Sequence, residues 1–344
     1  MQPETASLND AVERIAEPVI EATGGCRHIM ALHFDPRGSF KRGIIRCIVN
    51  RTGDVTTPGF IDTSRVNRVE MDSAYTATLG PELEIENDCA VVEDLPEYET
   101  SEFLGFEDPN VWCDVDTGTL HFYCTIPFLE HHSGDIMIYL GHAEGTDLDS
   151  LTMTAPVLEP ERGSHHGAKE VVIAPPSRDG VRYNLVESND IVEDTMYSVL
   201  RTAIAPDLGG PWEYGGIALH PNEYDYEWCG GHVSPGPLLP RSFVDVGADR
   251  RVGLLNGREA DPRAAGTGGF GRFTVGLLIY DYQAGSVEWV SDEPLFDDPD
   301  AETITFASAV RPDGPDDVLV YAHVDDSYVR AYRVNADGLE SFLP

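Results

Sequence analysis

The sequence predicts an all-β protein, and more specifically a five-bladed β-propeller with a short N-terminal helix. Short β-rich runs recur along the 344 residues, with Gly, Pro, Asp and Asn between them, and almost no segment after residue 25 has helical periodicity. This pattern is typical of a sandwich, a barrel or a propeller. The runs form about five groups, which begin near residues 28, 107, 169, 231 and 304, and this repetition favours the propeller.

The chain is predicted to divide into an N-terminal segment, residues 1–25, and a single propeller domain, residues 26–344. Residues 8–22 carry apolar side chains at helical spacing, so a short amphipathic helix is expected there. Gly24 and Gly25 follow it, as glycine often does at the end of a helix. The strands of the propeller are expected at residues 28–33, 43–49, 111–115, 119–123, 135–142, 170–174, 183–187, 197–204, 251–255, 274–280, 286–290, 304–310, 318–323 and 329–334.

The second group opens with a predicted β-hairpin, in which a turn over residues 116–118 separates two β-rich runs. Glu107 and Asp108 precede the first of these runs. Pro109 is expected to hold Asp108 in an extended conformation, because proline restricts the residue before it. A carboxylate held at the start of a strand is a candidate catalytic group, and an acid in a plain turn is the other reading of the same pattern.

Charge is the unusual property of this composition. The chain has 60 acidic and 23 basic residues, a net charge of −37, and its only lysines are Lys41 and Lys169. Self-repulsion of this size destabilises a compact state at low ionic strength, and molar salt screens it. We therefore expect a protein adapted to high salt. No basic stripe is available to neutralise phosphates, so nucleic acid is excluded as a partner.

The six cysteines form no C-x-x-C pair and no zinc-type spacing with histidine. Cys47, Cys113 and Cys124 lie in predicted strands, where a free thiol behaves as a small apolar side chain. The first residues have no basic region and no apolar segment of a signal peptide, and no run is long enough to span a membrane. The expected location is therefore cytoplasmic, with reduced cysteines and no membrane partner.

The segment FEDPNVW with the turn after it, residues 106–118, resembles the second-blade motif of five-bladed propeller glycosidases. The resemblance is closest to glycoside hydrolase family 130, the β-mannoside phosphorylases and related mannosidases, and more distant to family 43. Other segments of the chain are also similar to that family, and they occur in the same order as in the family. They are GIIRCIVNRTGD at 43–54, Lys169 at the start of a strand, HVSPGPLLP at 232–240, and YAHVD at 321–325. The resemblance implies a glycosidase-like enzyme whose substrate is a β-mannoside or a related oligosaccharide.

Two departures from the family pattern bear on the chemistry. Asn110 stands where the family usually has an arginine, so the resemblance gives less support to phosphate binding. The scheme of family 43 requires a base aspartate at the start of the first blade. Asp35 is the candidate by position, but it lies just before a turn and is interpreted as a turn residue.

Glycoside cleavage needs one group to protonate the leaving oxygen and another to activate the nucleophile. Asp108 is the first candidate for the general acid, by the resemblance and by its position, with Glu107 as its neighbour or alternative. Glu170 and Asp325 are candidates for the opposite carboxylate or for contacts to sugar hydroxyls. The remaining candidates for binding the sugar or a phosphate are Arg46, Arg51, Asn110, Lys169, His166, His232 and Trp228.

These binding candidates also have plainer readings. His166 is a histidine on a loop, and Trp228 is an aromatic side chain that would equally well anchor a long insertion in the core. Lys169 carries more weight because the chain has only two lysines.

The predicted function is inverting cleavage of a glycosidic bond, with hydrolysis favoured because Asn110 replaces the arginine. The alternatives are a phosphate-dependent β-mannoside phosphorylase, with inorganic phosphate as co-substrate, and a non-catalytic carbohydrate-binding propeller. A scaffold for protein partners is a third class that the fold allows. No other cofactor and no metal site is predicted.

The charge predicts a stability that depends on salt. Because molar salt shortens the Debye length to about 3 Å, it removes most of the repulsion among the surface carboxylates. We expect the thermal midpoint, followed by circular dichroism, to be higher in molar KCl than in dilute buffer. An unchanged or lower midpoint in KCl would contradict the proposed adaptation to salt.

Overall fold

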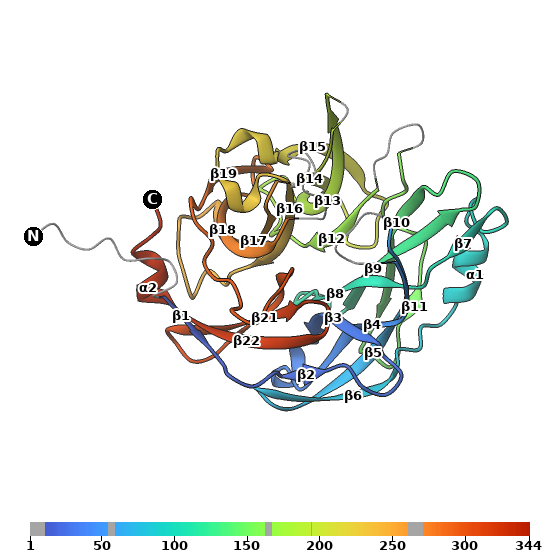
Figure 1. Cartoon of the computed structure of the whole chain (residues 1–344), viewed down its shortest axis with the longest axis horizontal. Coiled ribbons are helices and arrows are strands. Elements are labelled where there is room, and N and C mark those ends of the chain that lie inside the picture. Colours follow the sequence, from blue (N-terminus) through green and yellow to red (C-terminus); the bar gives the residue numbers. More distant parts are fainter. Residues whose placement is uncertain (1–10, 54–58, 162–166, 194, 261–270) are drawn as a thin grey trace, which may run out of the picture.

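The structure, a computed structural model, consists almost entirely of antiparallel strands arranged around a central region (Figure 1). It describes residues 11–53, 59–161, 167–193, 195–260 and 271–344. Within these ranges the α-helices are α1 (Asp88–Glu93) and α2 (Ala336–Glu340), both short. The prediction of an all-β protein is therefore confirmed.

The first two sheets follow one another along the chain. The first has the order β3 (His28–Phe34), β4 (Arg42–Thr52), β5 (Ile61–Ser73) and β6 (Thr76–Glu82). The second contains β8 (Glu107–Cys113), β9 (Leu120–Glu130), β10 (Ile136–Gly145) and β11 (Thr152–Met153), with β7 (Ser101–Phe103) on the other part of β9. Apolar side chains fill the space between the two sheets, where Phe122 and Phe128 belong to the same buried cluster as Ile44 and Val66.

The third sheet has eight strands in two antiparallel groups. The first group is β12 (Lys169–Val172), β13 (Arg182–Val192), β14 (Thr195–Ala205) and β15 (Glu213–Leu219). The second group is β16 (His232–Leu238), β17 (Arg250–Arg258), β18 (Phe273–Asp281) and β19 (Ser286–Val290). One parallel bridge, Ser198 with His232, joins the two groups. The last sheet contains β20 (Thr305–Pro312), β21 (Asp317–Val324) and β22 (Tyr328–Asn335).

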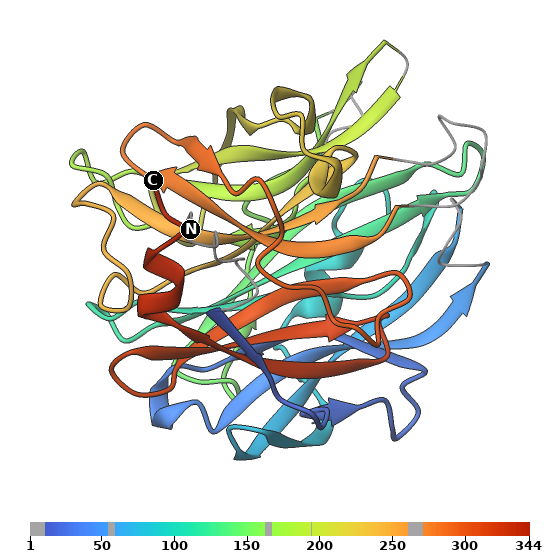
Figure 2. The same ribbon diagram turned by 60° about the vertical axis from the view of Figure 1, so that its left-hand side comes forward.

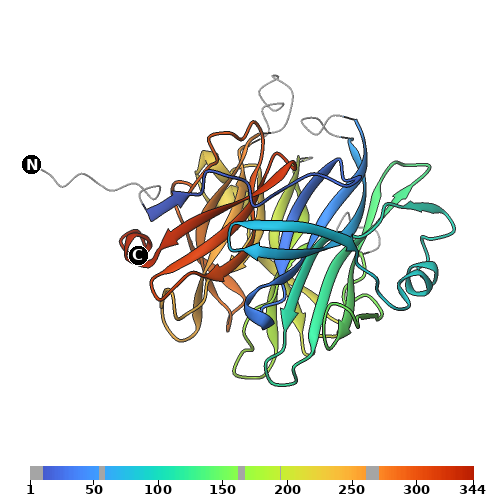
Figure 3. The ribbon, with the colours of Figure 1, turned by 90° about the horizontal axis from the view of Figure 1, so that it is seen from below.

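The N-terminal segment completes that last sheet as strand, so the predicted helix over residues 8–22 is wrong for residues 12–22. β1 (Val12–Arg14) and β2 (Ile20–Glu21) both pair antiparallel with β22. The blue N-terminal strand lies beside the red C-terminal strands in both side views (Figures 2 and 3). The physical reason is that β22 would otherwise leave its backbone groups unpaired at a sheet edge, a requirement that local helical periodicity does not reveal.

A buried carboxylate strengthens this junction between the two ends of the chain. Asp298 is fully buried, and its oxygens lie 3.2 Å from Nε of Arg14 and 2.9 Å from Nε of Arg330. Tyr332 donates its hydroxyl proton to the same carboxylate at 2.5 Å. Although burial opposes ionisation, the hydrogen bonds from Tyr332 and Arg14 hold the pKa of Asp298 below its ordinary value. The ionised form is therefore part of the folded structure.

The predicted hairpin of the second sheet is confirmed. Cys113 of β8 pairs with Leu120 of β9, and the turn between them is closed by the Asp114 amide, which donates to the Thr119 carbonyl. The turn also uses the carboxylate of Asp114, which accepts hydrogen bonds from the Asp116 amide and the Thr117 hydroxyl. This hairpin carries Glu107 and Asp108 at the beginning of β8.

The expectation that all the cysteines are reduced is wrong. Cys26 and Cys47 form a disulfide, with their Cα atoms 5.3 Å apart. The residues are 21 positions apart, and the hairpin of β3 and β4 brings them together, so no short sequence spacing indicated the pair. Cys89, Cys113, Cys124 and Cys229 are free. Over the described ranges, no helix has the length and apolar character needed to cross a membrane. The cytoplasmic location stays a prediction.

The Asp298 junction gives a test of how the chain ends are held. Asp298→Asn removes the charge that Arg14 and Arg330 face, and breaking a buried ion pair costs about 3 to 5 kcal/mol. We expect a loss of that order in the free energy of unfolding, measured by urea denaturation. The matched control is Asp300→Asn, because Asp300 also pairs with Arg14 and Arg330 but its side chain is 59% exposed. The control should cost about 1 kcal/mol or less, and equal losses in the two variants would contradict this account.

Candidate active site

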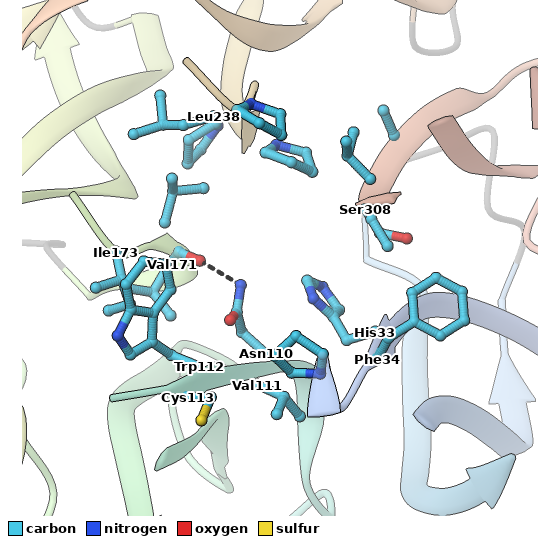
Figure 4. A pocket seen from close by; sticks show the side chains of 18 of the residues that line it. His33, Phe34, Asn110, Val111, Trp112, Cys113, Val171, Ile173, Leu238 and Ser308 are labelled. Atoms are coloured by element: carbon cyan, nitrogen blue, oxygen red, sulfur yellow. Dashed lines mark hydrogen bonds between the residues drawn. The ribbon is translucent and has the colours of Figure 1, made fainter. Parts of the chain in front are cut away.

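Two cavities lie along the central region, and the same five strands line both. These strands are β3, β8, β12, β16 and β20, the first of each group. The larger cavity, about 490 Å³, is lined by charged residues from the beginnings of β8 and β12 and from neighbouring strands such as β4 and β13. The smaller, about 370 Å³, is walled mainly by apolar side chains from further along the same strands (Figure 4). We call the larger one the carboxylate cavity and the smaller one the apolar cavity. Glu170 lines both.

Arg46 is the central cation of the carboxylate cavity. This buried side chain comes from β4, and its guanidinium donates to Asp108 Oδ1 and to Glu107 Oε1, each at 2.6 Å. Its Nε donates to the Ser64 hydroxyl at 3.0 Å. A guanidinium can meet several carboxylates at once because its donors form a planar fork. Arg46 therefore fixes two adjacent carboxylates of β8 from the neighbouring sheet.

The backbone at Asp108 departs from the expected extended conformation. Its φ is 44°, in the left-handed region, and the pairing of β8 with β9 breaks between Glu107 and Asn110. Such an irregularity re-aims a side chain out of the regular alternation of a strand. It lets both Glu107 and Asp108 meet Arg46, whereas consecutive residues of a regular strand point to opposite faces. The strained backbone is held by this ion pair and by Thr125, which donates to Asp108 Oδ2 at 3.4 Å.

The same irregularity recurs at matching places in the neighbouring strands. Glu170 of β12 has a φ of 51°, inside a break between Lys169 and Val172. Ala31 of β3 also has a φ of 51°, inside a break between Met30 and His33. The first sheet thus places an alanine where the next two place acids. Asp35 is bonded instead to Arg37, as the turn interpretation predicts.

Glu107 is adjacent to Asp108, and Glu170 is adjacent to Lys169; both acids have a raised pKa, but within the described ranges only Glu107 is bonded to a cation. Burial raises the pKa of Glu107 to about 7, although Arg46 opposes this shift. Burial, reinforced by the charges of Asp108 and Glu187, also raises the pKa of Glu170 well above its ordinary value. Among the described residues, Glu170 has neither a hydrogen-bond partner nor an ion-pair partner for its carboxyl group, which faces the cavity. Glu170 is therefore a shielded acid with an available proton.

A second ion cluster also lines the carboxylate cavity. Glu187 of β13 is buried, and its Oε1 lies 3.1 Å from Lys169 Nζ and 3.1 Å from His232 Nε2. Burial opposes ionisation of this carboxyl, but His232 and Lys169 outweigh it and lower the pKa of Glu187. Glu187 also raises the pKa of Lys169, so the lysine stays charged. Because the Lys169 side chain is 38% exposed, its charge is accessible from the cavity.

A third cluster supports the wall of the cavity. Arg51 donates to both oxygens of Asp62, at 2.7 and 2.8 Å, and to Asp326 at 3.0 Å. His323 Nε2 lies 3.6 Å from Asp326, and its ring stacks on Phe306. Asp62, Asp326 and His323 line the cavity. Arg51 is not among the lining residues, so its position fits a supporting role rather than the predicted contact with substrate.

Three other sequence candidates lie away from the carboxylate cavity. Asn110 lines the apolar cavity and donates its amide to the Val171 carbonyl at 2.8 Å (Figure 4). Asp325 accepts the backbone amides of residues 302–304 and does not line the cavity. Trp228 is buried in a hydrophobic cluster and donates to the Ser291 carbonyl, so it has no free face for a sugar. His166 lies outside the described residues.

The candidates that the structure brings together at the carboxylate cavity are Glu107, Asp108, Glu170, Arg46, Lys169 and His232. Sequence reasoning missed Asp62, Glu187 and Asp326, which supply the counter-charges. One signal was present for Glu187, an acid at the end of an apolar run. Asp326 is adjacent to the predicted Asp325. The sequence does not indicate which of these two neighbouring acids faces the cavity.

No family model matches the sequence, and a search of curated proteins finds no match. Solved structures do match the fold. A beta-1,2-mannobiose phosphorylase from Listeria innocua, in complex with beta-1,2-mannobiose, has a TM-score of 0.66 at 13% identity, covering 96% of this chain and 99% of that chain. A mannose phosphorylase from Leishmania mexicana, in complex with phosphate ion, has a TM-score of 0.52 at 16% identity, covering 94% and 88%.

An endo-arabinase from Bacteroides thetaiotaomicron also matches, with a TM-score of 0.55 at 10% identity, covering 94% of this chain and 97% of that chain. These neighbours are propeller glycosidases and phosphorylases, so the resemblance drawn from the sequence is confirmed at the level of the fold. At such low identities the matches show the fold alone.

Proposed function

We propose that the protein cleaves a glycosidic bond in the carboxylate cavity, by hydrolysis with inversion, and that Glu170 is the proton donor. The single observation that carries this proposal is the state of Glu170, an acid with a raised pKa and no partner for its carboxyl group among the described residues. A general acid must hold its proton near the working pH and deliver it to the leaving oxygen. The proposal revises the expectation from sequence, in which Asp108 had this role.

Asp108 suits the opposite role better. Its Oδ1 already accepts a 2.6 Å hydrogen bond from Arg46, which favours a carboxylate over a carboxylic acid as the partner. In the proposed reaction Asp108 accepts a proton from the attacking water as oxygen bonds to the anomeric carbon. The bond from that carbon to the leaving oxygen breaks, and Glu170 gives its proton to the leaving oxygen. A β-mannoside or related oligosaccharide stays the proposed substrate.

We propose that the protein that carries this site is a propeller of five blades. Five strands line both cavities, each followed by antiparallel neighbours. The eight-stranded sheet then counts as two blades, because a single bridge joins its halves. The acids of β8 and β12 enter the cavity from neighbouring blades, which is how a propeller brings distant parts of a chain to one site.

Hydrolysis is favoured over phosphorolysis by the balance of charge. Phosphorolysis needs cations that are free to hold an anionic nucleophile. Arg46 is already shared by Glu107 and Asp108, with Asp62 at 3.8 Å. Lys169 favours the alternative, because its side chain is 38% exposed. The similarity to two phosphorylases favours it too. A phosphate-dependent phosphorylase is therefore the second candidate function.

The proposed roles make different predictions for two kinds of substrate. Glu170→Gln should lower turnover of an unactivated β-mannoside about 10²- to 10⁴-fold, because the leaving oxygen loses its proton donor. The same variant should retain most of its turnover of an aryl β-mannoside with an acidic phenol, which leaves without a proton. Asp108→Asn should lose turnover of both. The matched control, Glu84→Gln, changes an exposed acid outside both cavities and should behave as wild type.

The pH profile adds a second readout to this comparison. Since Glu170 must be protonated to act, wild-type turnover should fall as the pH rises past its raised pKa, and Glu170→Gln should lack this decline. Equal losses of Glu170→Gln on both substrates would overturn the assignment of the proton donor. Sugar binding with no turnover of any glycoside would instead support the non-catalytic reading.

The choice between the two nucleophiles predicts the products. With hydrolysis, turnover should be the same with and without inorganic phosphate, and proton NMR should show free sugar, released first as the anomer opposite to that of the substrate. Liberation of sugar 1-phosphate that depends on added phosphate would overturn the hydrolase assignment. Retention of the anomeric configuration would contradict inversion.

A further inference from the structure

A cluster of metal-ligating side chains lies in the second sheet, outside both cavities. His121 of β9 pairs in register with Glu144 of β10, and His142 precedes Glu144 by two residues. Residues that face each other across an antiparallel pair, and residues two apart in one strand, share a face of the sheet. The three side chains therefore converge. Both histidines are buried, whereas Glu144 is exposed.

The distances among these side chains fit a shared ion. One ligating atom from each residue lies within 4.8 Å of the other two, and His121 Nδ1 lies 2.9 Å from His142 Nε2. Zinc binds imidazole nitrogen at about 2.0 to 2.1 Å in a tetrahedral arrangement. The two nitrogens thus need to open by only a few tenths of an ångström to hold one ion between them.

The hydrogen bonds behind His142 prepare its ring for this role. His142 Nδ1 lies 2.7 Å from the Thr154 hydroxyl, which has the carbonyls of His142 and Ala155 as acceptors for its own proton. The hydroxyl therefore accepts from Nδ1–H, and Nε2 carries the lone pair that faces His121. A fixed partner for the second ring nitrogen is the usual way in which a ligating histidine is oriented.

A turn from the neighbouring sheet covers the cluster. A Cβ atom placed on Gly209 would lie 3.6 Å from His142 Cε1 and 3.9 Å from Glu144 Oε2. Asp207 in the same turn accepts the Gly209 amide at 2.8 Å and adds negative charge beside both histidines. The turn follows β14, so an ion held here would lie between two sheets.

We propose that His121, His142 and Glu144 form a structural site for a divalent transition metal ion of the zinc class. Two imidazole nitrogens and a carboxylate suit Zn²⁺, while Ca²⁺ and Mg²⁺ prefer oxygen ligands alone. Because Glu144 is exposed, water can reach the ion and complete its coordination. The sequence does not predict this site, since the ligands come from paired strands and not from a short motif. The site does not depend on the proposed glycosidase activity, because none of the three residues lines either cavity.

Zn²⁺ titration of the chelator-treated full-length protein in molar KCl, followed by calorimetry, tests this site. We expect one equivalent to bind tightly and to raise the thermal midpoint. Glu144→Gln removes one ligand from an exposed position, so the variant should fold, and it should weaken binding at least about 10-fold. The matched control is the triple variant His131→Gln, His132→Gln, Cys89→Ser. It removes other exposed donors and should bind as wild type.

Substitution by Co²⁺ gives an independent readout, because tetrahedral cobalt with nitrogen ligands has intense visible absorption bands. The bands should appear with wild type and the triple variant and be lost or shifted in Glu144→Gln. Equal Zn²⁺ affinity in wild type and Glu144→Gln would overturn the proposal. So would binding that disappears in the triple variant, or no binding at all, which would leave the histidines as a hydrogen-bonded pair.

Discussion

The pairing of Arg46 with Glu107 and Asp108 is the interaction on which the carboxylate cavity depends. All three charges are shielded from water, and an isolated buried charge costs several kcal/mol. Arg46 comes from β4 and the two acids from β8, so the same contact that neutralises the acids also joins the first sheet to the second. The break in β8 at Asp108 makes this contact possible, because it turns two consecutive side chains toward one guanidinium.

The other buried acids around the cavity follow the same rule. Glu187 has Lys169 and His232, and the pair Asp62 and Asp326 shares Arg51. In each cluster the cation and its acids come from different strands or from the turn between two strands. Glu170 is the exception among the described acids that line the cavity, since no cation is bonded to it. A shielded acid without a bonded cation keeps its proton. Such an arrangement destabilises the fold when the residue is only structural, but a proton donor requires it.

The sequence predicts those features of the fold and the site that depend on residues close together in the chain. The hairpin after Asp108 has its own turn residues, and the acids at the starts of β8 and β12 were recognisable before any partner was known. The strand at residues 12–14, the disulfide of Cys26 with Cys47, and the counter-charges of Asp62 and Glu187 depend on partners in other strands, outside their own local segment. The role of Trp228 could not be predicted for a similar reason. An aromatic residue among acids has the same local sequence pattern whether it stacks on a sugar or lies in the core.

The charge of the chain and the chemistry of the cavity are linked through salt. At molar salt the Debye length is about 3 Å, so attractions and repulsions among exposed groups fade together, while pairs shielded from solvent are screened far less. If the protein works in such conditions, as its composition predicts, the buried pairs of Arg46 and Glu187 keep their strength where surface pairs lose theirs. A carboxylate-rich surface then serves solubility without altering the ionisation of Glu170, whose surroundings are set by burial and by neighbours inside the cavity.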